Sequence, residues 1–221
     1  MNTLRQKAFR ARDELLLGSG LTVIAGALDA YAYLEHGAVF AGLQAGNLVL
    51  LGINFGQLQL AEMGRYLTAL LAFVIGIGLS RGLQRYLEKR QRDNQNVGLW
   101  ATFGLLIIVL ATTGVVPDWV ATALLSLTAA VELQLFQETM GLETVLSVTA
   151  TLLNGTRLKD REARQKALDA LTTVGSFVLG AVLVAAFSKL LAGYTVLVPI
   201  LVVAGLIFWQ YEQNHRRKWK H

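Results

Sequence analysis

Long apolar runs without charged side chains recur along this chain, and they limit its possible folds more than any other feature. Four of these runs cover residues 99–116, 120–131, 174–187 and 194–209. A helix of about 20 apolar residues crosses a hydrocarbon core of about 30 Å. Charged residues make up only 16% of the 221 residues, against roughly a quarter in soluble domains. We therefore expect an all-α polytopic membrane protein, which excludes water-soluble enzymes and nucleic-acid-binding proteins.

The basic residues gather in clusters that alternate with the apolar segments. All of the 20 Lys and Arg residues except Arg65 and Lys189 lie within four ranges, 5–12, 81–92, 157–166 and 216–220. Short loops rich in Lys and Arg remain in the cytoplasm. We therefore expect all four clusters and both termini on the cytoplasmic side, with an even number of membrane crossings between successive clusters.

The number of apolar segments between successive clusters is not always even. They cover residues 14–34, 37–57 and 62–80, then 99–116, 118–137 and 141–156, and finally 167–190 and 193–211. Each group of three must contain one segment that enters and leaves on the same side. Two segments with polar, Gly-containing breaks fit this role: residues 37–57 and the shorter 141–156. We expect about six transmembrane helices plus two broken or re-entrant segments; eight full helices, or broken helices that still cross, are the alternatives.

The order of segments indicates an inverted repeat within a single membrane domain. Residues 1–116 and 117–221 would each hold a helix, a broken segment and two more helices. The number of residues from Asp29 to Gln44 in the first unit equals the number from Gln134 to Thr149 in the second. Three crossings per unit invert the second unit, and inverted repeats with discontinuous helices are typical of secondary transporters.

The two breaks have a physical use inside a membrane. Non-helical backbone survives at membrane depth only where protein or a water-filled cavity covers it. Asn, Gln and Thr side chains can cap the freed half-helix ends, whose partial charges attract ions or polar solutes. The candidate substrate- or ion-binding residues are therefore Asp29, Gln44, Asn47, Gln134, Thr149, Thr151, Asn154 and Thr156, with Glu132 as a secondary candidate.

Each candidate also has a structural interpretation. A carboxylate at membrane depth is costly and usually faces a cavity or a partner, so Asp29 either couples transport to a proton or cation, or caps the break. Glu132 could be only an interfacial charge, and the amides and hydroxyls could only satisfy backbone groups. Glycines spaced as G-x-x-x-G are expected to pack helices closely; they are Gly42 and Gly46, Gly52 and Gly56, and Gly78 and Gly82.

Several chemistries lack the residues that they need. The chain has no Cys, and it contains no H-E-x-x-H motif or P-loop. No nucleophile–base pair lies at membrane depth, so we expect no enzyme, no metal site and no cofactor. The partners that we expect are membrane lipids, a small solute or ion and a second copy in a homodimer, but no nucleic acid.

A family resemblance rests on two stretches. "AGALDAYAYLEHGAVFAGLQAGNLVLLG", from Ala25 to Gly52, resembles the signature of the YoaK-like (DUF1275 or UPF0700) family of bacterial integral membrane proteins. "LQLFQETMGLETVLSVTATLLNGTRL", from Leu133 to Leu158, is similar to the family's second motif. The chain departs from the family at Ala45 and Asn154, where the family has Thr, and at Leu135, where it has Asn. The resemblance implies the bacterial cytoplasmic (inner) membrane and names no substrate.

These features together favour a small secondary transporter or channel-like permease for a small polar or ionic solute, coupled to protons or another cation. The alternative is a non-transporting membrane protein that binds lipid, senses a signal or assists assembly.

Overall fold

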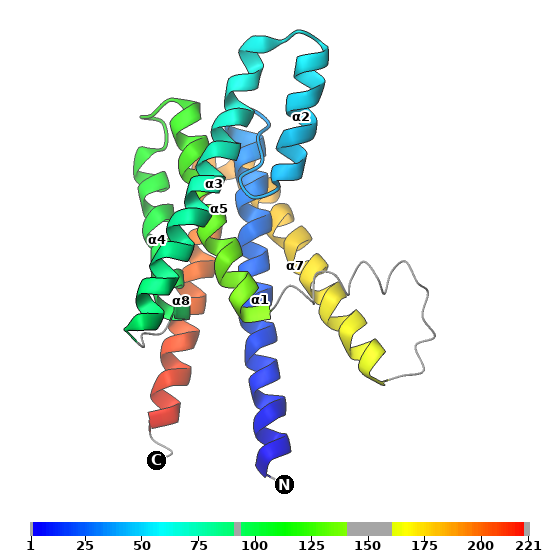
Figure 1. Cartoon of the computed structure of the whole chain (residues 1–221), viewed down its shortest axis with the longest axis vertical. Coiled ribbons are helices and arrows are strands. Elements are labelled where there is room, and N and C mark those ends of the chain that lie inside the picture. Colours follow the sequence, from blue (N-terminus) through cyan, green and yellow to red (C-terminus); the bar gives the residue numbers. More distant parts are fainter. Residues whose placement is uncertain (1, 91–93, 141–160, 219–221) are drawn as a thin grey trace.

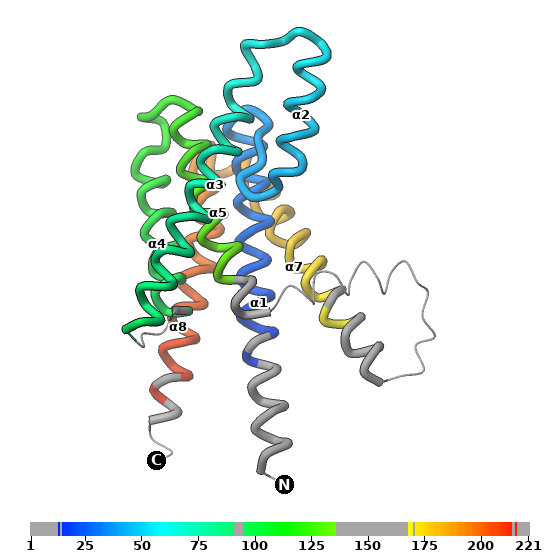
Figure 2. The backbone as a smooth tube through the Cα atoms, in the orientation of Figure 1, coloured from blue at the N-terminus to red at the C-terminus, as the bar shows by residue number. Residues whose placement is uncertain are grey.

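All regular secondary structure in the described chain is helical, as expected for an all-α protein. The computed structural model describes residues 2–90, 94–140 and 161–218 (Figure 1); Figure 2 draws in grey every residue that is not described in full. Within these ranges no strand occurs. The helices are α1 (Asn2–Glu35), α2 (Gln44–Gly56), α3 (Leu60–Lys89), α4 (Asn94–Thr112), α5 (Asp118–Met140), α7 (Arg161–Leu191) and α8 (Leu197–Lys218).

Four of the described helices have the length and apolarity of membrane spans. Four described segments are long and apolar enough to cross a membrane: Leu15–Glu35, Leu60–Lys89, Gln95–Thr112 and Leu171–Leu191. Most of the helices run roughly along the long axis of the molecule, whereas α7 is inclined to it (Figure 1). The chain is therefore a polytopic helical membrane protein.

The distribution of side chains on α2 also fits a lipid environment. Asn47 and Asn54 are its buried residues, whereas Leu48, Val49 and Phe55 are more than half exposed, at 56%, 63% and 62%. In water, large apolar side chains of this kind would turn inward. An apolar exterior with polar groups inside is the arrangement that hydrocarbon favours.

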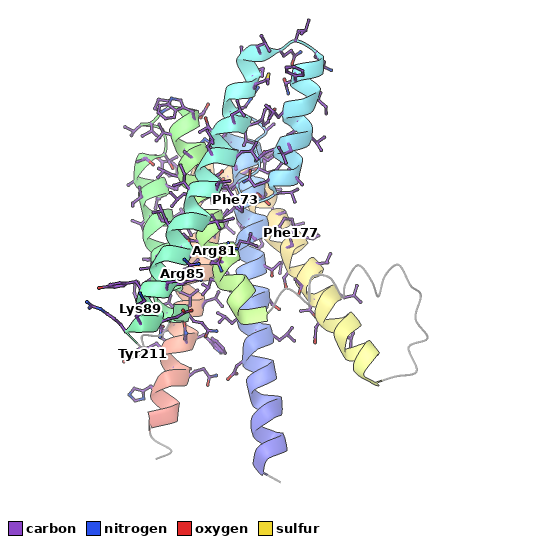
Figure 3. All side chains as sticks on the ribbon, in the orientation of Figure 1. Phe73, Arg81, Arg85, Lys89, Phe177 and Tyr211 are labelled. Atoms are coloured by element: carbon purple, nitrogen blue, oxygen red, sulfur yellow. The ribbon has the colours of Figure 1, made fainter. Side chains whose placement is uncertain are left out.

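The helix ends that carry basic residues lie toward the same end of the molecule. α1 and α7 begin, and α3 and α8 end, in the lower half of the molecule as drawn in Figure 1. Arg81, Arg85 and Lys89 mark the last third of α3 at this end (Figure 3). We call this end of the bundle the basic end.

Glycines allow two helix pairs to approach very closely. A Cβ added to Gly26 of α1 would lie 2.0 Å from the carbonyl oxygen of Phe177 in α7, and one added to Gly180 of α7 would lie 2.0 Å from that of Val23 in α1. Phe177 is labelled in Figure 3. On the other side of the bundle, a Cβ at Gly76 of α3 would lie 2.7 Å from the Cβ of Ala130 in α5, and backbone atoms of Leu127 lie next to it. Only glycine fits at these crossings.

Within the described chain, the expected G-x-x-x-G packing is absent for two of the three glycine pairs. A Cβ at Gly52, Gly56, Gly78 or Gly82 would meet nothing within 4 Å among the described residues. These four glycines are exposed on α2 and α3, so their spacing serves no helix contact among the described residues. Gly42 and Gly46 do have close neighbours.

The first broken segment returns to the end of the bundle at which it started. Gly37 and Ala38 turn the chain after α1 with φ of 79° and 59°, and the irregular residues 39–43 lead back alongside α1 (Figure 1). α2 then runs back, and α3 begins beyond the end of α1. With 13 residues, α2 is about 20 Å long, shorter than a hydrocarbon core. The second break, residues 141–156, lies outside the described residues.

Candidate functional site

Asp29 supports the irregular backbone after α1. It lies on α1 and is 5% exposed. Its Oδ1 accepts hydrogen bonds from the amide of Gly42 at 2.6 Å and from that of Leu43 at 3.3 Å. These amides precede α2, where no preceding helical turn supplies acceptors. Asp29 therefore caps the broken segment from a neighbouring helix.

Asn47 fastens the other side of the same loop. Its Oδ1 accepts from the amide of Phe40 at 2.9 Å, and its Nδ2 donates to the carbonyl of Phe40 at 2.7 Å and to Oε1 of Gln44 at 2.9 Å. Gln44 Nε2 in turn donates to the carbonyl of Ala41 at 2.7 Å. The side chain of Asn47 is fully buried. The polar break thus satisfies its own backbone, as a segment at membrane depth must.

Two glycines let this loop fit between the helices. A Cβ at Gly42 would lie 3.5 Å from the Cβ of Ala129 and 3.7 Å from Oδ1 of Asp29, so Gly42 lies between α5 and α1. A Cβ at Gly46 would lie 2.8 Å from the ring of Phe40, so a larger residue there would displace that ring. The loop tip is therefore in contact with both α1 and α5.

A second buried carboxyl group lies near Asp29. Glu132, one helical turn after Ala129 on α5, is 3% exposed and interacts electrostatically with Asp29. Its Oε1 has no hydrogen-bond partner among the described residues. Two carboxylates in a low-dielectric site cannot both ionise at low cost. At least one of the two carboxyl groups therefore holds a proton, or a cation neutralises the pair.

Gln134, which the sequence paired with Asp29, faces another part of the bundle. It lines a cavity of about 110 Å³ between α3, α4 and α5, with Ser80 and Gln84. Two positions after Glu132, it lies on the opposite side of α5 because successive helical residues turn by about 100°. Among the predicted residues, the structure brings Asp29, Gln44, Asn47 and Glu132 together around the first break. Thr149, Thr151, Asn154 and Thr156 lie outside the described residues.

Two hydroxyl residues of α5 were missed in the sequence. Thr122 and Ser126 are 1% and 0% exposed, and their hydroxyl oxygens have no hydrogen-bond partner in the described chain. Thr128 differs because its hydroxyl donates to the carbonyl of Leu124 at 2.8 Å. The i, i+4 spacing of Thr122 and Ser126, continued by Ala129, is the signal that could have revealed a polar stripe on one face.

A family model matches the chain from residue 17 to residue 209. The chain belongs to the DUF1275 family. The description of this family is "protein of unknown function". This match confirms the family expected from the two motifs. No curated protein and no solved structure matches the chain. Asp29, the first break and Glu132 all lie within the part of the chain that matches the DUF1275 model.

Proposed function

We propose that this DUF1275 protein is a small secondary transporter or channel-like permease for a small polar or ionic solute, with the carboxyl groups of Asp29 and Glu132 as its coupling centre. The observation that carries the proposal is the pair of buried carboxyl groups beside a broken segment that makes its own hydrogen bonds. Proton and cation transport use intramembrane carboxyl groups of this kind.

The chemistry of the pair suits a coupling role. Asp29 already accepts two backbone hydrogen bonds, which favour its ionised form. Glu132 has an oxygen without a donor, so it is the member that takes up a proton or faces a cation. A change in the charge of Glu132 would alter the electrostatic field on Asp29 and the loop that Asp29 holds.

The helix contacts support the proposed inverted repeat. In the proposed repeat, α1 corresponds to α5 and α3 corresponds to α7. α1 packs on α7, and the corresponding pair, α5 and α3, also packs together. The glycine crossings follow the same rule. At one constant separation along the chain, Gly76 corresponds to Gly180, and Leu127 next to Gly76 corresponds to Val23 next to Gly180. The same separation relates Ala130 to Gly26, which lies at the same crossing as Val23. That separation takes Asp29 to Leu133, which lies between Glu132 and Gln134.

The proposed topology follows the basic end. Six helices, α1, α3, α4, α5, α7 and α8, would cross the bacterial cytoplasmic membrane, with the basic end and both termini inside. The first broken segment would enter from outside and leave on the same side.

The test is flux in liposomes that contain the purified protein and a pH-sensitive dye. Small amines, amino acids, sugars and carboxylates are added outside, one at a time, under an imposed membrane potential. We expect Glu132→Gln to lower solute-dependent proton flux at least about tenfold. Asp29→Asn, which keeps an acceptor for the Gly42 amide, should also lower it. Glu62→Gln, at an exposed site, is the matched control. If Glu132→Gln and Asp29→Asn both leave the flux of a transported solute at the wild-type level, the coupling role is wrong.

One observation favours a second function, that of a non-transporting membrane protein. The hydrogen bonds from Gly42 and Leu43 to Asp29 are all within the chain, which is what a purely structural cap requires. This function predicts that no solute produces flux above that of empty liposomes. It also predicts that Asp29→Ala destabilises the protein while Asp29→Asn does not.

A further inference from the structure

A cavity lies at the end of the bundle opposite the basic end, away from the coupling centre. Its volume is about 310 Å³, and it lies between the end of α1, the α4–α5 connection and the α7–α8 turn. Neither Asp29 nor Glu132 lines it. We call it the outer cavity. Its volume is at the lower end of the range for small-molecule sites, about 300–1,000 Å³.

The charges of the outer cavity are negative. Glu35 and Asp118 line it, and none of its lining residues is Lys or Arg. Among the described residues, no hydrogen bond or ion pair holds the Glu35 carboxylate. Arg65 lies near this end, but it donates to the carbonyl of Gly37 at 2.8 Å and pairs with Glu62. A solute in the cavity therefore meets two carboxylates with no lysine or arginine among its lining residues.

Three helix ends add to this negative potential. α1 ends at Glu35, α4 at Thr112 and α7 at Leu191, and each end borders the cavity through residues such as Thr113 and Gly193. The C-terminal end of a helix carries about half a negative charge from its unpaired carbonyl groups. All three contributions act in the same direction as the carboxylates. The start of α5 at Asp118 has the opposite sign, and the carboxylate of Asp118 lies at that helix end.

His36 contributes a hydrogen-bond acceptor to the wall of the cavity. Its Nδ1 lies 3.2 Å from Oδ1 of Asp118. In the neutral ring, the carboxylate selects the tautomer with the proton on Nδ1, which leaves a lone pair on Nε2. Nε2 is buried without a hydrogen-bond partner among the described residues, and the side chain is only 11% exposed. A ligand that satisfies Nε2 of the neutral ring has to be an N–H or O–H donor.

Aromatic rings complete the site. Tyr31 and Tyr194 line the cavity, and the hydroxyl of Tyr31 donates to the carbonyl of Gly193 at 3.0 Å, which fixes its ring. The rings of Tyr31 and His36 meet edge to face at 5.2 Å. Aromatic faces attract organic cations within about 6 Å.

We infer that the outer cavity binds a small organic ammonium ion. The ammonium group supplies the N–H donors that the acceptors lack, and its charge matches the carboxylates and the helix ends. Access is from the aqueous end, because the side chain of Asp118 at the rim is 77% exposed. The inference does not depend on transport, since a cation can bind here whether or not it crosses the membrane.

The test uses the absence of cysteine from the chain. Thr113→Cys places a thiol in the wall of the outer cavity, and Val115→Cys places one outside it, at a position that is 81% exposed. Both variants are labelled in detergent with cationic 2-aminoethyl methanethiosulfonate and with its anionic 2-sulfonatoethyl analogue. Relative to position 115, we expect position 113 to prefer the cationic reagent by about tenfold. Millimolar n-butylammonium should slow labelling at 113, and n-butanol should not.

Charge variants separate a site from general surface charge. Glu35→Gln and Asp118→Asn in the Thr113→Cys background should each reduce the cation preference and the n-butylammonium protection several-fold. Glu88→Gln removes an exposed carboxylate of α3 that does not line the cavity and should change neither. The inference is wrong if positions 113 and 115 show the same preference, if n-butanol protects as well as n-butylammonium, or if Glu88→Gln causes the same loss. Far-UV circular dichroism verifies that each variant is folded.

Discussion

Replacement of Gly180 by Ala tests how the two halves of the chain meet. The added Cβ would lie 2.0 Å from the carbonyl oxygen of Val23 and 2.9 Å from the amide nitrogen of Ala27. Both atoms belong to the backbone of α1, so no side-chain rotation relieves the clash. The two helices must separate by about 1 Å, and a gap of that size forfeits up to about half of the dispersion energy of each contact.

The expected cost follows from this separation. Overpacking of this kind costs about 3 kcal/mol, and the better helix propensity of Ala returns about 1 kcal/mol. We therefore expect Gly180→Ala to lower the free energy of unfolding by about 2 kcal/mol. Gly175, on the same helix, is the matched control because a Cβ there would meet nothing within 4 Å. Gly175→Ala should leave stability unchanged or raise it by up to about 1 kcal/mol.

The assay is reversible unfolding of the purified protein by SDS in mixed micelles, followed by far-UV circular dichroism. Gly180→Ala should shift the transition to a lower SDS fraction, and Gly175→Ala should not. Equal transitions for the two variants would refute the reasoning, because they would mean that the α1–α7 crossing tolerates a methyl group.

Two further predictions concern buried polar side chains. Asn47→Ala leaves both polar groups of the loop backbone at Phe40 without partners, so it should cost about 3 kcal/mol in the same SDS assay; Asn54→Ala, which loses one bond to a carbonyl within its own helix, should cost less than about 1 kcal/mol, and equal costs would contradict the role of Asn47. If solute passes along α5, Thr122→Val and Ser126→Ala should lower flux in liposomes about fivefold without loss of stability. Thr128→Val, whose hydroxyl is already paired, should leave flux unchanged, and an equal decrease in all three variants would argue against a polar path.

The sequence predicted the helices because each apolar run is long enough to specify one. Charged residues extend several helices beyond these runs, as in α1, which begins at Asn2 rather than near residue 14. The sequence predicted a break within residues 37–57 but placed it at Gln44, Gly46 and Asn47. These residues form the start of α2, and the irregular backbone lies just before them, at residues 39–43. Its support by Asp29 was one of the two interpretations that the sequence left open.

The partner of Asp29 was not predictable from spacing. The sequence ranked Gln134 above Glu132 because Gln134 occupies the corresponding place in the repeat, yet the structure places Glu132 near Asp29 and Gln134 in another cavity. Which of two polar residues on one helix faces a neighbour depends on the rotation of that helix, which distant contacts such as Gly76 with Ala130 set. The contacts of the glycines were not predictable from spacing either. Gly26 and Gly78 both lie in apolar helical segments, but only Gly26 lies at a helix crossing.

The two glycine crossings have a mechanical consequence. Each joins a helix from residues 1–116 to a helix from residues 117–221, through Gly26 and Gly180 on one side and through Gly76 and Ala130 on the other. Surfaces in such close contact cannot slide without clashes, since packed interiors deform little. Any rigid-body rotation of one half against the other therefore has its axis close to the line through these two crossings. Residues far from that line, such as those that border the outer cavity, would move the most.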